Sequence, residues 1–125
     1  MTLNYNNKKY TDLTYLHELS KGNADFELKM INTFVNQAQV DVQKMKQALV
    51  DKNWDVIYLI AHKMKASLHF VGLSSLHADM LSVELYAKQR TNFQELPELI
   101  SSISSIIEIA IDELNDEITK RGVSN

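Results

Sequence analysis

The chain has 125 residues, of which 45% are hydrophobic and 23% charged, a balance typical of one globular domain with its own core. Three glycines and one proline are too few for a turn-rich all-β fold, so long helices are expected. Thirteen basic and sixteen acidic side chains give a net charge of −3, which disfavours nucleic acid as a partner.

The absence of cysteine excludes disulfide scaffolds, thiol catalysis and cysteine-ligated metal sites. Residues 1–10 are polar and lack the apolar stretch of a signal peptide, so we expect a flexible arm there. The longest segment without Asp, Glu, Lys or Arg runs over 66–78, which is short of the roughly 20 apolar residues that a membrane span needs. We therefore expect a cytoplasmic protein without a membrane partner.

Residues 11–122 are expected to form a single domain that begins with a short helix. Thr11 and Asp12 favour the start of this helix, and Gly22 favours its end. The next helix is predicted from residue 24 to about residue 50, because apolar residues recur there every three or four positions. These positions are Phe26, Met30, Phe34, Ala38, Val42, Met45 and Leu49.

Three further helices are predicted after this one. Asn53 is expected to cap a helix that extends to Val71, and Gly72 is expected to form a tight corner. The apolar pattern then restarts at Leu73, so the two helices should pack as antiparallel neighbours. The last helix is expected to begin near residue 94 or 95, because Pro97 is tolerated only in a first turn, and to stop at Gly122. The predicted fold is all-α, an up-down-up-down four-helix bundle with a short additional N-terminal helix.

The polar side of the third long segment carries the candidate site. At about 100° per residue, His62 lies roughly 130° away from the apolar stripe of its helix. Tyr58, Lys65 and His69 fall on the same side as His62. A rigid helix thus presents an imidazole, an ammonium group and a phenol to solvent or to a partner.

A family resemblance emerges from this stretch. Residues 61–67, Ala-His-Lys-Met-Lys-Ala-Ser, resemble the His-x-x-Lys-Gly motif of histidine-containing phosphotransfer (HPt) domains, and Gly72 follows at a suitable distance. Residues 10–16 resemble the first helix of that family, so the likeness extends over nearly the whole chain. Ala66 stands where the family usually has Gly, and we expect slower or more selective docking from its methyl group.

The resemblance implies a carrier in a two-component phosphorelay. His62 would accept a phosphoryl group from a receiver-domain aspartate and pass it to another, and Lys65 would stabilise its charge. Tyr58, Ala66 and His69 would be neighbours of the site. The receivers would belong to a hybrid histidine kinase or a response regulator and would bring the Mg²⁺, so the chain would need no cofactor. The sequence has no glycine-rich phosphate loop, so no autonomous kinase activity is expected.

Phe70 is expected in one of two places. It lies far from the apolar stripe of its helix, so it is either an exposed docking residue for a partner or packed under the following helix. We assign no role to His17 or His77.

Two alternatives to a phosphorelay carrier are compatible with a helical bundle. A metal-binding bundle is disfavoured, because the sequence has no Glu-x-x-His pair and Lys21 stands where a zinc-protease motif after His17 would need its second histidine. An interaction module with the same bundle but no phosphoryl transfer remains the alternative, and the pairing of His62 with Lys65 makes it the less favoured of the two.

Overall fold

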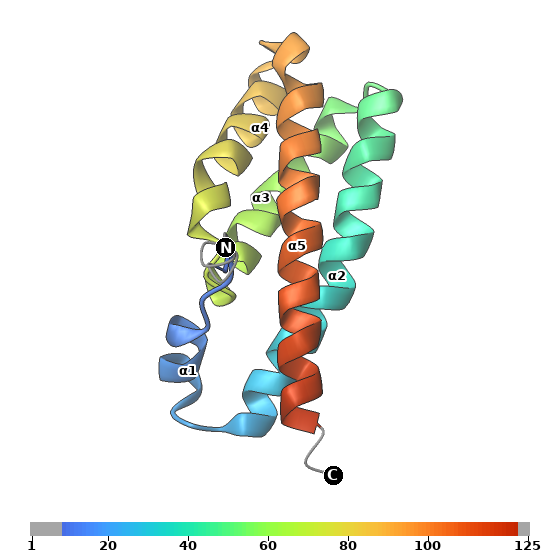
Figure 1. The fold of residues 1–125 in the computed structure, drawn as a ribbon. Coiled ribbons are helices and arrows are strands. Elements are labelled where there is room, and N and C mark those ends of the chain that lie inside the picture. The colour runs from blue at the N-terminus through green and yellow to red at the C-terminus, as the bar shows by residue number, and fades with distance from the viewer. Residues whose placement is uncertain (1–8, 123–125) are drawn as a thin grey trace, which may run out of the picture.

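A computed structural model of the chain describes residues 9–122, and the predicted arm over 1–10 therefore lies mostly outside the described residues. The described part is helical, and Figure 1 shows its long helices side by side. Within 9–122, no helix is both long and apolar enough to cross a membrane. The elements are α1 (Thr14–Ser20), α2 (Ala24–Val50), α3 (Trp54–Phe70), the 3-10 turn η2 (Ser74–Leu76), α4 (His77–Gln89), the 3-10 turn η3 (Phe93–Glu95) and α5 (Leu96–Gly122).

The starts of α2 and α3 follow from capping side chains. Asn23 Oδ1 accepts a hydrogen bond of 3.0 Å from the backbone N–H of Phe26, which confirms the start of α2. Asn53 Oδ1 accepts from the N–H of Val56 at 3.3 Å, which confirms the cap of α3. Such caps satisfy N–H groups that have no partner within the first helical turn.

Two helices begin later than predicted. The apolar pattern after Gly72 starts with buried Leu73, but α4 itself begins only after η2, at His77. The spacing of three residues from Leu73 to Leu76 fits a 3-10 turn as well as an α-helix, so the apolar pattern cannot distinguish these two structures. Likewise residues 93–95 form η3, so α5 begins at Leu96 instead of residue 94 or 95. Pro97 lies in the first turn of α5, as predicted.

The four long helices close into a ring. The chain runs up α2, down α3, up α4 and down α5 (Figure 1), and α5 packs against both α4 and α2. The antiparallel packing of α3 against α4 is confirmed. The short α1 packs against α2 and α3. The all-α bundle predicted from the sequence is therefore the observed fold.

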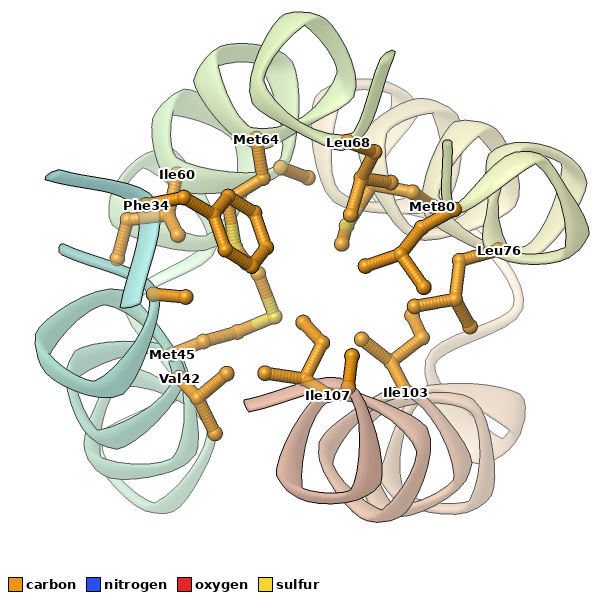
Figure 2. Packing of buried hydrophobic residues seen from close by; sticks show 14 of the residues in the cluster. Phe34, Val42, Met45, Ile60, Met64, Leu68, Leu76, Met80, Ile103 and Ile107 are labelled. Atoms are coloured by element: carbon orange, nitrogen blue, oxygen red, sulfur yellow. The ribbon is translucent and has the colours of Figure 1, made fainter. Parts of the chain in front are cut away.

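Apolar side chains from all four long helices fill the centre of the ring (Figure 2). One predicted core position is wrong, because Phe26 is 37% exposed, while Ile31, Val35 and Ala48 are buried. The helix α2 contacts α1, α3 and α5, so its buried face is wider than a single stripe.

Three carboxylates are buried within this bundle, and each is paired with a cation from another helix. A buried carboxylate is tolerated only when it is neutralised and hydrogen-bonded. The pairs and their N···O distances are Glu27 with Arg121 at 2.9 Å, Asp41 with Lys63 at 2.9 Å, and Glu84 with Lys65 at 2.5 Å.

The corner at Gly72 yields a stability prediction. Gly72 has a φ of 72°, and a Cβ atom there would collide with the backbone oxygen of Asp12. The N–H of Asp12 donates a 2.9 Å hydrogen bond to the oxygen of Val71, so the two segments cannot separate freely. We expect Gly72→Ala to lower the free energy of unfolding by about 2 kcal/mol or more, measured by urea denaturation.

Gly22→Ala is the matched control. Gly22 also has a positive φ, of 84°, but nothing lies within 4 Å of a Cβ atom built there. Only the conformational penalty of roughly 1 kcal/mol applies to this variant. Equal losses in the two variants would contradict the close approach at Gly72.

Candidate functional site

The side chain of His62 stands near the middle of α3 and is 61% exposed. Its Nδ1 atom lies 2.6 Å from Oε2 of Glu84, which comes from the neighbouring helix α4. The other carboxylate oxygen of Glu84, Oε1, lies 2.5 Å from Nζ of Lys65. One carboxylate thus contacts both the imidazole and the ammonium group that were predicted from the sequence.

Glu84 is largely buried, with 8% of its side chain exposed. Burial by itself raises the pKa of this carboxyl group, but the contacts with Lys65 and His62 outweigh burial and leave the pKa below its ordinary value. Glu84 is therefore ionised at neutral pH. Lys65, which is 24% exposed, supplies the charge that neutralises it.

The ionised carboxylate determines which tautomer of neutral His62 is favoured. A carboxylate only accepts hydrogen bonds, so Nδ1 must carry the proton that points at Glu84. The lone pair of the neutral ring is then on Nε2, the nitrogen that makes no hydrogen bond to residues 9–122. The arrangement offers an oriented nitrogen nucleophile on the surface of the bundle.

Tyr58 and Lys88 border the imidazole. The Tyr58 ring lies one helical turn before His62, with the ring centroids 5.9 Å apart and the planes at 27°. The Nζ atom of Lys88, from α4, lies 5.7 Å from the centroid of the Tyr58 ring, within the range of a cation–π contact. The predicted position of Tyr58 beside His62 is thus found in the structure.

The other predicted neighbours lie further along α3. Ala66 is exposed one turn after His62, which leaves its methyl group on the surface. His69 is also exposed, but its ring packs on Tyr15 of α1, with the centroids 4.4 Å apart. The structure therefore brings together His62, Lys65 and Tyr58, while His69 contacts α1 instead.

Phe70 lies away from the charged network. It is half-buried, its ring centroid is 6.1 Å from that of Tyr15, and it lines a groove together with α2 residues that include Met30 and Phe34. The expectation that Phe70 packs under the following helix is wrong, because that helix covers a different face of α3, the face of Lys65. Phe70 thus marks an apolar groove on the α2 side of the site.

Glu84 is the site residue that sequence reasoning missed. The sequence does contain an indication of its role, namely an acidic residue within an apolar stripe. Glu84 lies between Val83 and Ala87 on the buried side of α4, one turn after Met80. A lone acidic residue in such a stripe must be paired or neutral. Its partners are not apparent from the sequence, since His62 lies 22 residues away.

No three His, Asp or Glu side chains in the described part of the chain gather into a group that could hold a metal ion. The site brings together an imidazole, a carboxylate, two lysines and a phenol ring, all from α3 and α4.

The chain resembles known proteins over most of its length. A family model described as the Hpt domain matches residues 29–120. No curated protein sequence matches the chain. Histidine-containing phosphotransfer protein B (HptB) from Pseudomonas aeruginosa PAO1 is 21% identical in its crystal structure, with a TM-score of 0.80 over 89% of this chain and 96% of that one. The HPT domain of the Hpt sensor hybrid histidine kinase from Shewanella is 13% identical, with a TM-score of 0.77 over 89% and 95% of the two chains. The two structures share the fold of this bundle.

The lowered pKa of Glu84 leads to a prediction about acid stability. A carboxyl group whose folded pKa lies below its ordinary value of 4.5 contributes stability that is fully present above that pH. The contribution is lost as the pH falls through the folded pKa. Glu84→Gln removes the titrating group. The difference in free energy of unfolding between wild type and this variant, called the stability gap below, should therefore narrow below pH 4.5.

Urea unfolding of both proteins between neutral pH and about pH 3 measures this gap. Other acidic groups titrate equally in the two proteins and cancel in the difference. A gap that stays constant over this range would contradict the ionised, paired state of Glu84.

Proposed function

Because the chain belongs to the Hpt domain family, whose members are phosphotransfer carriers of two-component signalling, we propose that His62 is the residue that carries the phosphoryl group. It would take the group from an aspartyl phosphate of one receiver domain and pass it to an aspartate of another. The observation that supports this role best is the 2.6 Å contact between Nδ1 of His62 and the Glu84 carboxylate. That contact leaves Nε2 as the free nucleophile on an exposed side chain.

The transfer step follows from this tautomer. The lone pair of Nε2 attacks phosphorus, a bond from Nε2 to phosphorus forms, and the bond from the aspartate oxygen to phosphorus breaks, releasing a carboxylate. No proton has to leave Nε2. The ring retains its proton on Nδ1 and becomes an imidazolium carrying a phosphoryl group, and the reverse step regenerates the neutral ring.

Glu84 is a positioning residue in this proposal. Its carboxylate holds the Nδ1 proton and therefore keeps the ring in one orientation and one tautomer. It also faces the positive charge that appears on the ring when Nε2 is phosphorylated. Because the carboxylate is already ionised and buried, little reorganisation is needed during the step.

Lys65 stabilises the charge of the site. Its Nζ lies on the Glu84 carboxylate, so an approaching phosphoryl group does not meet an unneutralised negative charge beside His62. This indirect action is how we interpret the role expected for Lys65 from the sequence motif.

The partners in this proposal are receiver domains of a hybrid histidine kinase or a response regulator, acting in the cytoplasm. Each receiver would bring its own Mg²⁺, and the chain would bind no cofactor, nucleic acid or membrane. Phe70 and the groove that it lines provide an apolar area for docking, and Ala66 would touch the partner close to His62.

The phosphorylation site can be tested by mass spectrometry after incubation with phosphoramidate at neutral to alkaline pH. We expect one phosphate on His62 and none on His62→Gln, with the helical circular dichroism unchanged. His69→Gln is the matched control, because it removes an exposed imidazole from the same helix and should still be phosphorylated. Phosphate on His62→Gln, or none on wild type even with phosphorylated receivers, would favour the alternative of an interaction module.

The role of Lys65 can be tested with a second pair of variants. Lys65→Ala leaves the Glu84 charge unneutralised, so we expect the rate of phosphorylation by phosphoramidate to fall roughly tenfold. Lys63→Ala is the control, because Lys63 pairs with Asp41 of α2 on another face of α3. Stopped reactions analysed by intact-protein mass spectrometry give both rates, and equal rates for the two variants would refute the role of Lys65.

A further inference from the structure

Three lysines of α3 and α4 lie within about two helical turns of His62 or of its partner Glu84, and two of them are already paired with carboxylates. Lys63 Nζ lies 2.9 Å from Asp41, and Lys65 Nζ lies 2.5 Å from Glu84. Only 4% of the Asp41 side chain and 8% of the Glu84 side chain are exposed. Removing either lysine from its partner would leave a buried, unpaired charge, which is strongly unfavourable.

Lys88 differs from the other two. It is exposed on α4, one helical turn beyond Glu84, and no carboxylate in residues 9–122 forms an ion pair with it. Its Nζ lies 5.7 Å from the Tyr58 ring, and that ring is stacked 5.9 Å from the imidazole of His62. The ammonium group, the phenol ring and the imidazole thus follow one another along the boundary between α3 and α4.

The charges at the site indicate a need for one more cation. A phosphoryl group on Nε2 carries a charge of about −2, and the imidazolium formed beneath it carries one positive charge. Glu84 and Lys65 cancel each other, so the phosphorylated site keeps one negative charge in excess. Lys88 can leave an exposed aromatic face at little cost, because such cation–π contacts are weak.

We propose that Lys88 is a phosphoryl-binding residue, which moves from the Tyr58 ring to the phosphoryl oxygens when His62 is phosphorylated, while Lys65 stays with Glu84. The inference rests on the proposed function of His62. The alternative role for Lys88 is purely structural: its positive charge would only stabilise the last turn of α4 and would not contact the phosphoryl group.

The first experiment compares lysine reactivity in wild type before and after phosphorylation. The protein is treated with an amine acetylating reagent at alkaline pH, where phosphohistidine persists, and the acetylated lysines are quantified by peptide mass spectrometry. We expect acetylation of Lys88 to fall at least about threefold on phosphorylation, because an ammonium group bound to the phosphoryl oxygens loses its proton less readily. Acetylation of Lys65 and of remote Lys120 should not change.

The second experiment measures phosphorylation rates with phosphoramidate. Lys88→Met should react roughly tenfold more slowly than wild type, whereas Lys88→Arg, which retains the positive charge, should react at nearly the wild-type rate. Lys120→Met is the control, because it removes the same charge from the last turn of α5. A purely structural role would lower the thermal midpoint of Lys88→Met but leave its rate unchanged.

The outcomes separate the two proposals. If wild type gains no phosphate on His62, the proposed function fails. Suppose that His62 is phosphorylated, that acetylation of Lys88 does not fall, and that Lys88→Met is phosphorylated at the wild-type rate. The inference about Lys88 is then overturned, and the proposed function stands. A fall in reactivity at Lys65 instead of Lys88 would identify Lys65 as the phosphoryl-binding lysine and would also overturn it.

Discussion

The arrangement of the site depends on one buried carboxylate, that of Glu84. Its two oxygens contact Nδ1 of His62 and Nζ of Lys65, so a single group on α4 positions two groups on α3. Without this carboxylate the imidazole could adopt either tautomer and Lys65 would extend into solvent. Because Glu84 comes from α4 and both of its partners come from α3, the site is assembled by the packing of α3 against α4.

The same physical constraint recurs elsewhere in the bundle. Asp41 binds α2 to α3 through Lys63, and Glu27 binds α2 to α5 through Arg121. Glu27 also contacts the Ser20 hydroxyl and His17, so α1 joins this second network. Buried ion pairs add little net stability, but a helix pairing that left one of these carboxylates alone would be strongly disfavoured. The three pairs therefore restrict how helices of similar apolar character can pack.

The two flanks of α3 differ in chemistry. The flank that faces α4 carries the polar network of His62, Lys65 and Glu84, with Tyr58 and Lys88 at its edge. The flank that faces α2 carries an apolar groove lined by Phe70. A partner bound over this helix would thus meet apolar area on one side and reactive groups on the other.

The sequence by itself determined most of the helices and the exposed histidine on which the proposed function rests. Apolar spacing and capping asparagines are local signals, so the bounds of α2 and the starts of α2 and α3 could be predicted, as could the exposure of His62. Only the tertiary structure decided the partners of that residue. Glu84 lies 22 positions from His62, and helical periodicity says which face a residue occupies but not which helix covers that face. For the same reason the ion pair of Lys65 and the location of Phe70 became apparent only when α3 was packed between α2 and α4.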